Sequence, residues 1–434
     1  MPQIIGQSKS LDHRSVPTRK IYFCTGLAFG GIQCYYFQTR LGVTRDSGDW
    51  NNAKNLKKEN MAQIFDPLPI RDITLPNRIV VSPMCEYSSI DGFANDWHLV
   101  HLGSRAVGGA GLVFTEATAV TPEGRISPED LGIWSDAHIE FLARITHFLK
   151  SQGCVPGMQL AHAGRKGSTQ KPWVGSEKLS PEEGAWVPVA PSAIAYSDKY
   201  PFPQALSKEG IRGVVEAFAN AARRALDAGF RVLEIHAAHG YLIHEFYSPL
   251  SNQRTDEYGG SFENRTRLAR EIVSAIRKQW PERLPLFIRI SATDWKEGGW
   301  DLDQSVELVK QLAPLGVDLV DCSSAGLVPD QKIVAGPGFQ VPFSERIRRD
   351  TGVMTATVGL IETKEQVAEI LAKNRADLVL MAREFLRDPY WPLRAARELG
   401  YKISWPAQYL RAAPPDSPAR KPLDVETLKA KGMN

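Results

Sequence analysis

Two histidines and a tyrosine stand close together in the middle of the sequence, at His236, His239 and Tyr241. They follow Val232–His236, a short run of β-branched and apolar residues that predicts a strand. Two imidazoles and a phenol grouped at the end of one strand can polarise a carbonyl group and donate a proton. The spacing alone leaves two other interpretations open: a zinc site that adds His244, and histidines that serve only the structure.

Polar residues also interrupt or end other apolar runs. Arg289 stands inside the apolar run Phe287–Ile290, and burying its charge would require an anion or a hydrogen-bonded acceptor. Gln159 ends another such run, where a polar residue has a structural explanation as well as a functional one. Cys85, taken alone, is better explained as a small buried apolar residue. These residues therefore extend the candidate site to several strands.

Eight short apolar runs alternate with longer amphipathic stretches after Met61. The runs are continuous rather than alternating, which is typical of parallel strands covered by helices. The expected strands are Arg78–Pro83, Gly111–Glu116, Gly157–Leu160, Val232–His236, Leu286–Ile290, Leu319–Cys322, Met354–Thr357 and Leu378–Met381. Expected helices include Ser207–Ala228, Glu263–Trp280, Leu302–Pro314, Thr363–Ala372 and Tyr390–Leu399. Eight such units predict an α/β fold with a single (β/α)8 TIM barrel.

The alternative fold is a doubly wound open sheet, and two observations disfavour it. The first expected strand is not followed by G-x-G-x-x-G, and the candidate residues fall at the ends of many strands, where a barrel assembles its site. The stretch Ser207–Ala228 illustrates how the helices are bounded. Ser207 is a plausible N-cap, and Gly229 stands where the helix has to end.

The composition is ordinary for a globular protein, with 434 residues, 43% hydrophobic and 23% charged, and a net charge of +3. It excludes collagen-like, coiled-coil and fully disordered chains. The body of the chain is close to neutral, so we expect no nucleic-acid partner. Five cysteines without a C-x-x-C pair indicate reduced thiols in a cytoplasmic protein and no zinc-ribbon or iron–sulfur site.

The two ends of the chain differ from the middle. Residues 1–60 carry nine basic and four acidic residues, a composition typical of an organelle-targeting extension, although a disordered tail explains it equally well. Its apolar stretch 21–37 is too short and too polar to span a bilayer. The organisation expected is therefore an extension over 1–60, a barrel over 61–400 and a tail over 401–434.

The stretch 234–265 closely resembles the old yellow enzyme family of FMN-dependent NAD(P)H ene-reductases, and the resemblance covers Ile64–Arg411. It implies an FMN cofactor with NADPH or NADH as the reductant, and NADPH is the weakly preferred one. By position, His236 and His239 would bind the oxygen of an α,β-unsaturated carbonyl compound, an activated alkene, over the flavin. Tyr241 would donate a proton to the substrate α-carbon.

The run from Ser82 to Tyr87 resembles the thermophilic-like branch of that family. The resemblance implies that Cys85 lies against the flavin and that Tyr87 reaches the substrate oxygen. Glu86 departs from the pattern, because a neutral residue is expected there. The flavin-binding residues implied by the resemblance are Ser82, Pro83, Met84, Cys85, Ala117, Gln159, His236, Arg289, Gly359, Ala382 and Arg383. Ala382 stands where a glycine is frequent.

The segment Trp405–Arg411 resembles the tail that in this branch enters a neighbouring active site. Arg411 would then bind substrate in a second copy of the chain, so a homo-dimer or homo-tetramer is expected. An exposed cation explains Arg411 equally well. The Pro-rich residues beyond it are expected to be disordered. The hypothesis is a ping-pong ene-reductase without a metal. A barrel that binds FMN without turnover and a metal-dependent hydrolase are its rivals.

Overall fold

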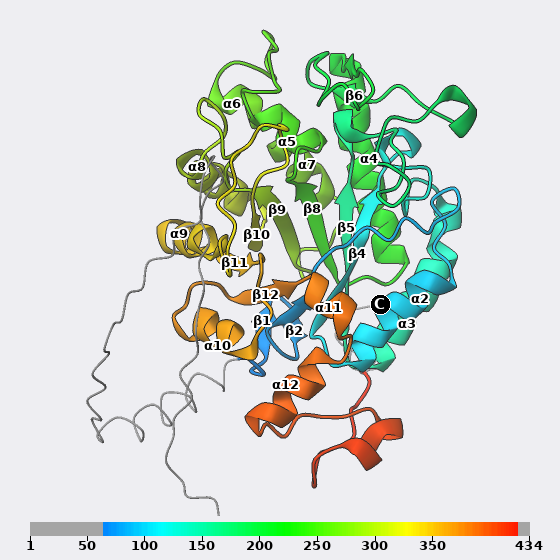
Figure 1. Ribbon diagram of the computed structural model, residues 1–434, viewed down its shortest axis with the longest axis vertical. Helices are drawn as coiled ribbons and strands as arrows, with labels where there is room; N and C mark the ends of the chain where they lie inside the picture. The colour runs from blue at the N-terminus through cyan, green and yellow to red at the C-terminus, as the bar shows by residue number, and fades with distance from the viewer. Residues whose placement is uncertain (1–63, 424–434) are drawn as a thin grey trace, which may run out of the picture. The chain divides into compact units, whose positions relative to one another are not determined.

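The computed structural model describes residues 64–423, and a closed barrel of eight parallel strands lies at their centre (Figure 1). The strands follow chain order around the barrel, and the last one pairs with the first. They are β3 (Ile79–Val81), β4 (Leu112–Ala119), β5 (Val155–Ala161), β8 (Val232–Ala237), β9 (Leu286–Ser291), β10 (Leu319–Ser323), β11 (Met354–Thr357) and β12 (Leu378–Met381). The predicted barrel is confirmed. Each expected strand overlaps one of the observed strands, and their bounds differ by no more than two or three residues. The extension 1–60 lies outside the described residues.

The strand register directs a set of polar side chains into the barrel. Gln159 pairs with Glu234, while His236 and Asp321 both pair with Arg289. Residues paired in a parallel ladder share a face of the sheet, and every second residue along a strand returns to it. Arg289 also reaches across the barrel to the residue that follows β3, so this shared face is the inner one.

Helices surround the barrel on its outside, as Figure 1 shows. The longer ones are α2 (Asp96–Val107), α3 (Ile139–Ser151), α4 (Lys208–Asp227), α7 (Arg267–Arg277), α8 (Leu302–Leu312), α9 (Val341–Thr351), α10 (Lys364–Ala372) and α12 (Trp391–Leu399). Short helices are α5 (Leu242–Tyr247), α6 (Phe262–Arg265) and α11 (Arg383–Arg387). Within residues 64–423, no helix has both the length and the apolar composition needed to cross a membrane.

Local chemistry explains where two of the predicted helices begin or break. The Ser207 hydroxyl accepts the Gly210 N–H at 3.1 Å and caps α4, and Gly229 follows the helix with a φ of +86°. Both expectations are confirmed. The single helix expected over 263–280 is wrong, because it is divided at Thr266. The Thr266 hydroxyl donates to the Phe262 carbonyl at 2.9 Å, a side-chain bond that competes with continuous helix.

Three further segments were not anticipated. A hairpin of β1 (Leu68–Ile70) and β2 (Ile73–Leu75) lies beside the start of the barrel strands, where Arg71 pairs with Asp318 and Glu282. A long connection follows β5 and carries the short pair β6 (Val189–Ala190) and β7 (Gln204–Ala205). The third segment is the end of the chain.

The Pro-rich end, expected to be disordered, packs against the barrel helices through residue 423. Arg420 donates to the carbonyls of Ala106 and Val107 at the end of α2, at 2.8 and 3.1 Å. The Leu423 N–H donates to the Lys150 carbonyl on α3 at 2.9 Å. A half-buried guanidinium that donates to several carbonyl groups ties this segment to the ends of the helices.

Candidate active site

Three aromatic rings meet just beyond the end of β8. The ring centroids of His236 and His239 are 5.1 Å apart, and those of His236 and Tyr241 are 5.0 Å apart. Both pairs are nearly perpendicular, at 89° and 88°. His236 lies on the strand, and Tyr241 caps the start of α5. The three residues predicted as one group therefore lie together.

Both histidines are neutral at physiological pH. Burial lowers the pKa of His236 and of His239 well below the usual range, and the nearby Arg289 and Lys166 lower both further. His236 Nδ1 accepts the Ala238 N–H at 3.2 Å, which places the proton on Nε2. That Nε2–H makes no hydrogen bond with a described residue, so it is free to donate to a ligand.

His239 is held by a residue at the end of β10. Its Nε2 lies 2.7 Å from Ser323 Oγ. Ser323 Oγ also lies 3.3 Å from Gln340 Oε1, but that oxygen already accepts from Ser324 at 2.6 Å. The serine can therefore give its one hydroxyl proton to the closer His239 Nε2 and leave the imidazole proton on Nδ1. In that tautomer, His239 presents a second N–H at the end of the barrel strands.

Tyr241 keeps its proton, because burial raises the pKa of its phenol well above the usual value. Lys166 lies over it, with Nζ 5.1 Å from the ring centroid. The same ammonium donates to the carbonyls of His239 at 2.9 Å and Gly326 at 3.1 Å. Burial lowers the pKa of Lys166 to about 8. The sequence analysis missed this residue, although it is a lysine just after a predicted strand.

A buried pair of residues holds the loop that carries these groups. The Gly240 N–H donates to His244 Nδ1 at 2.9 Å, and His244 Nε2 lies 2.7 Å from Asp294 Oδ1. The second carboxylate oxygen of Asp294 accepts from Ser248 and from the Trp300 N–H, each at 2.7 Å. His244 therefore faces away from the other two histidines, and no group of metal-ligating side chains occurs within residues 64–423. The three histidines are therefore not grouped as a zinc site would require.

The main chain of the loop after β8 lies very close to the main chain of the loop after β10. A Cβ atom on Gly240 would lie 2.1 Å from the Gly326 carbonyl oxygen, and one on Gly326 would lie 2.6 Å from His239. His239 itself has a φ of +58°. Only glycine at both contact positions allows this approach.

The residues predicted at the end of β3 gather beside those at the end of β4. Cys85 lies within hydrogen-bonding reach of the Ala117 N–H and of the Tyr87 hydroxyl. Burial, together with the charges of Asp130 and Glu116, raises the pKa of Cys85 well above its usual value, so the thiol is protonated. Ser82, Pro83 and Met84 lead from the strand into this group.

Glu86, the acid that departs from the family pattern, turns toward α2. Its carboxylate accepts from Trp97 Nε1 at 2.9 Å and lies 3.2 Å from His101 Nε2. Burial raises the pKa of Glu86. The charge is therefore held by groups of α2 instead of by the residues at the end of the barrel.

A polar layer crosses the inside of the barrel below the histidines. Gln159 Nε2 donates to Glu234 Oε1 at 2.7 Å. Arg289 donates from Nε to Asp321 Oδ2 at 2.5 Å and from Nη2 to Ser82 Oγ at 2.9 Å. All five residues are buried. The acceptor that the sequence required for Arg289 is thus Asp321.

Two late strands frame a small cavity. Gly359, Ala382 and Arg383 line it together, after β11 and β12. Gly359 has a φ of +121°, and a Cβ there would lie 2.9 Å from Gln340 Nε2. Ala382 has a φ of −108°, so this position does not need the left-handed backbone that favours glycine. Arg383 is exposed and forms no ion pair with a described residue.

The structure does not bring Arg411 to the histidines of its own chain. It is exposed in the turn Ala407–Ala412, and the tail lies in Figure 1 below α12, at the opposite end from α5. A role for Arg411 in a neighbouring copy remains a prediction.

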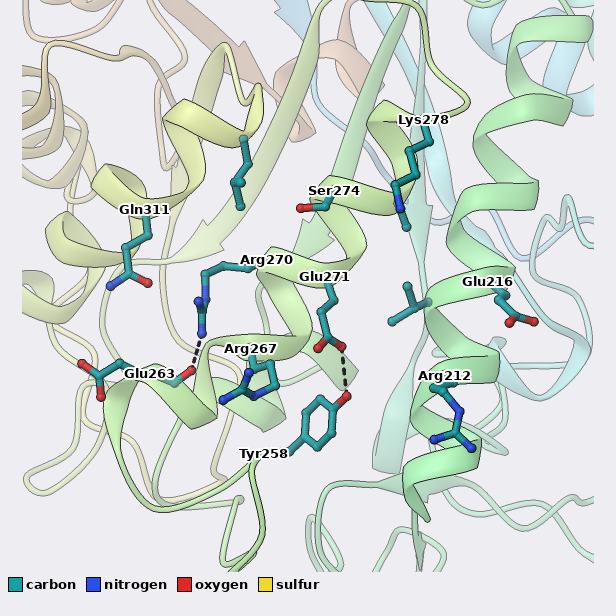
Figure 2. Close-up of a pocket in the computed structure, with 13 residues that line it drawn as sticks. Arg212, Glu216, Tyr258, Glu263, Arg267, Arg270, Glu271, Ser274, Lys278 and Gln311 are labelled. Atoms are coloured by element: carbon teal, nitrogen blue, oxygen red, sulfur yellow. Dashed lines mark hydrogen bonds between the residues drawn. The ribbon is translucent and has the colours of Figure 1, made fainter.

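A separate groove of about 790 Å³ opens on the outer surface between α4, α7 and α8. Figure 2 shows two hydrogen bonds among the side chains that line it: Tyr258 donates to Glu271 at 3.0 Å, and Arg270 donates to the Glu263 carbonyl at 2.6 Å. None of the residues predicted to carry chemistry lines it. The candidate active site is therefore the group of side chains at the ends of the strands.

Comparison with known proteins gives similarities across the whole barrel. The sequence profile of the NADH:flavin oxidoreductase / NADH oxidase family matches residues 63–401. The NADPH dehydrogenase of Geobacillus thermodenitrificans is 50% identical over 350 residues, which cover 80% of this chain and 98% of the relative. The NADPH dehydrogenase of Bacillus subtilis is 48% identical over 351 residues, with the same coverage of 80% and 98%. The structure of morphinone reductase in complex with tetrahydroNAD aligns with a TM-score of 0.64 and 28% identity, covering 77% of this chain and 91% of that one.

Proposed function

Because this chain belongs to the NADH:flavin oxidoreductase / NADH oxidase family, we propose that it is an FMN-dependent ene-reductase. It uses NADPH or NADH to reduce the C=C bond of α,β-unsaturated carbonyl compounds or related activated alkenes. Oxidoreductase chemistry with FMN and a nicotinamide reductant follows from the family and from the NADPH dehydrogenases it resembles. The choice of an activated alkene as the substrate rests on the side chains at the end of β8.

The residues present fit FMN. Gln159 Oε1 and Arg289 Nη1 make no hydrogen bond with a described residue and are not sealed inside the protein. They offer one acceptor and one donor, as the pyrimidine edge of a flavin requires. The cavity lined by Gly359, Ala382 and Arg383 would hold the phosphate, because an unpaired guanidinium and a close-lying main chain suit a dianion.

When bound, FMN supplies the redox chemistry: it takes a hydride from the nicotinamide and passes it to the β-carbon of the alkene. His236 and His239 hold the carbonyl oxygen of the substrate with two neutral N–H groups. As negative charge grows on that oxygen, these donors bind it more strongly than they bind the ground state, which lowers the barrier. Neutral imidazoles suit this role, since they donate hydrogen bonds without transferring a proton to the oxygen.

Tyr241 supplies the proton for the α-carbon. Its phenol retains the proton at neutral pH, and it stands 5.0 Å from the His236 ring, beside the place where the carbonyl would bind. Cys85 and Tyr87 contribute a protonated thiol and a hydroxyl next to the flavin and the substrate. The nicotinamide and the alkene would use this one pocket in turn, which gives a ping-pong sequence.

One observation carries the proposal: two neutral imidazoles and a protonated phenol lie with ring centroids about 5 Å apart at the end of one barrel strand. A barrel that only binds FMN has no need for this group. The alternative metal-dependent hydrolase requires a set of ligands that the described residues do not form.

An anaerobic visible spectrum tests the proposal. The purified yellow protein should lose its flavin absorbance on addition of NADPH and recover it on addition of cyclohexenone. Recovery without an alkene, or a flavin that NADPH reduces and cyclohexenone leaves reduced, would contradict ene-reduction. A protein that takes up no FMN would contradict the whole proposal.

A further inference from the structure

Two buried carboxyl groups lie next to each other in the polar layer, and each leaves one oxygen without a partner. Glu234 and Asp321 are fully buried. Glu234 Oε1 accepts from Gln159, and Asp321 Oδ2 accepts from Arg289. Glu234 Oε2 and Asp321 Oδ1 accept no hydrogen bond from any residue between 64 and 423. The two carboxyl groups lie within hydrogen-bonding reach of each other.

The charges around this pair do not balance if both groups are ionised. Arg289 is the cation that contacts both, with Nε 2.5 Å from Asp321 Oδ2 and 3.7 Å from Glu234 Oε1. On the same inner face, the flanking strands β5 and β11 present the neutral residues Gln159 and Ala356. His236, which is paired with Arg289 in the register, is also neutral. Two carboxylates beside one guanidinium would leave a net negative charge deep in the barrel.

We propose that Glu234 and Asp321 share one proton in the folded protein, so that the pair balances Arg289 with a single negative charge. Glu234 Oε2 carries the proton and donates it to Asp321 Oδ1. Glu234 Oε1 then keeps its bond from Gln159, and Asp321 Oδ2 keeps its bond from Arg289. One proton thus satisfies both unpartnered oxygens, and every oxygen of the two groups has a partner.

The electrostatics agree with this arrangement. Burial raises the pKa of Glu234, and the neighbouring Asp321 raises it further. Burial also raises the pKa of Asp321, although Arg289 opposes that effect. Two carboxyl groups at hydrogen-bonding distance titrate as a pair, because ionising the second one beside the first is unfavourable.

This shared proton makes the pair a positioning device for Arg289. This consequence rests on the proposed function, in which the guanidinium faces the flavin. With one shared proton, the net charge of Arg289, Glu234 and Asp321 is zero. Arg289 Nη1 can then stabilise the negative charge that develops on the flavin when it is reduced. Loss of the proton at alkaline pH would add a negative charge there and lower the midpoint potential of the FMN.

Infrared spectroscopy of the FMN-free protein tests the proton directly and does not depend on the flavin. The wild type should show a carboxylic-acid C=O band at neutral pH that shifts in D2O. In the shared arrangement, both Glu234→Gln and Asp321→Asn should remove this band, because each leaves a single carboxylate beside Arg289. Asp377→Asn is the matched control, since Asp377 is a buried carboxylate that pairs with Arg348 at 3.0 Å without a second carboxyl group. It should leave the band unchanged.

The two substitutions separate the shared proton from a protonated Glu234 acting alone. If Asp321→Asn retains the band while Glu234→Gln removes it, the proton is not shared and the proposal is wrong. If both variants keep every carboxylic-acid band of the wild type, the proposal is also wrong. Glu245 and Asp130, whose pKa values burial raises to about 8 and about 7, give bands of their own that all these variants retain. If Glu234→Gln does not fold, Glu234→Asp takes its place and should move the band instead of removing it.

The midpoint potential of bound FMN, measured against pH, gives the second readout. At neutral pH, Glu234→Gln should have the wild-type potential, because an amide replaces a protonated acid and the net charge stays the same. At alkaline pH, the wild type and Asp377→Asn should show an additional fall that Glu234→Gln lacks. If Glu234→Gln raises the potential at neutral pH, both carboxyl groups are ionised and the proposal fails. If the protein bound no FMN, the proposed function would be wrong. The infrared measurement would still test the shared proton, because it is made without FMN.

Discussion

The ammonium group of Lys166 stands 5.1 Å from the centre of the Tyr241 ring and donates to the main-chain carbonyl of His239 at 2.9 Å. Lys166 comes from the connection after β5, whereas Tyr241 and His239 come from the loop after β8. One cation therefore contacts both the Tyr241 ring and the main chain of His239, and it places positive charge beside the phenol that we propose as the proton donor.

The first prediction concerns the alkaline side of the pH profile. The pKa of Lys166 is lowered to about 8, so the ammonium loses its charge as the pH rises through that value. Oxidation of the reduced enzyme by cyclohexenone should slow over the same range, because a phenolate forming on Tyr241 loses its neighbouring cation. In Lys166→Met, this oxidation should be slow at all pH values and should not slow further at alkaline pH. Stopped-flow measurement of the rate against pH would show this. Lys150→Met is the control: burial lowers the pKa of Lys150 to about 8 as well, but that lysine lies on α3. If the rate of Lys150→Met did not fall at alkaline pH, the fall could not be assigned to Lys166.

The second prediction concerns the two histidines. Replacing His236 and His239 together with Ala should remove phenol binding and reduce enone turnover by about 10²-fold or more, because both donors to the carbonyl oxygen are lost. FMN should remain bound, since Gln159 and Arg289 are unchanged. Titration with a phenol, followed by the shift of the flavin spectrum, measures the first effect, and steady-state kinetics measure the second. Turnover near the wild-type rate would mean that the carbonyl site lies elsewhere.

The third prediction separates the two half-reactions. Tyr241→Phe removes the proton donor and keeps the ring, so oxidation by enones should slow by about 10²-fold or more. Reduction by NADPH should change little, because it needs no proton from the phenol. Rapid mixing of each half-reaction under nitrogen provides the measurement. Equal effects on both would argue that the tyrosine only shapes the pocket.

The fourth prediction concerns stability. Burial alone would raise the pKa of Asp294, but its bonds with His244, Ser248 and the Trp300 N–H lower it overall. A carboxyl group whose pKa is lowered in the folded state stabilises the protein above its unfolded pKa, and the contribution is lost as the pH falls. Asp294→Asn should therefore cost about 3 kcal/mol of unfolding free energy at neutral pH and reduce the loss of stability in acid.

Denaturant unfolding at several pH values measures that change. The control is Asp136→Asn, because Asp136 is an exposed carboxylate that pairs with Arg223 and Arg224 on the surface. Its removal should change stability far less than Asp294→Asn does, because solvent screens an exposed ion pair. If the two variants lost equal unfolding free energy, the buried His244–Asp294 pair would stabilise the protein no more than a surface ion pair does.

The fifth prediction concerns the phosphate of the cofactor. Arg383→Ala should weaken FMN binding by about 10- to 100-fold, since hydrogen bonds to charged groups contribute about 1.5–3 kcal/mol. Binding of riboflavin, which lacks the phosphate, should be unaffected. Arg387→Ala on the same short helix is the control, because Arg387 already pairs with Glu362 and Glu384. Quenching of flavin fluorescence gives both affinities, and an equal loss for riboflavin would contradict the phosphate site.

Much of the fold could be predicted because the strands are buried on both faces and therefore appear in the sequence as continuous apolar runs. The strand β11, for example, has the predicted bounds Met354–Thr357. The group of His236, His239 and Tyr241 could be predicted for a related reason, since its members are near in sequence and follow one strand. In both cases, a pattern within a short stretch of sequence was enough for the prediction.

The features that escaped prediction depend on contacts between distant segments. Lys166 lies close to Tyr241 only because the connection after β5 folds over the end of β8, and no local pattern reports this. The proximity of Glu234 to Asp321 depends on the register of three strands. The break at Thr266 depends on one side-chain hydrogen bond that competes with helix. Arg420 holds the tail through carbonyl groups, which leave no trace in a pattern of apolar residues.

The close approach of Gly240 and Gly326 bears on how this enzyme could be altered by evolution or in the laboratory. The loops after β8 and β10 both border the active site, so they are natural targets for a library that seeks new substrates. Their main chains touch, so side chains added at either glycine would separate the loops and displace His239, whatever those side chains offered to the substrate. A productive library would therefore keep both glycines and vary the flanking positions. In a lineage, the two loops would be expected to change length together or not at all.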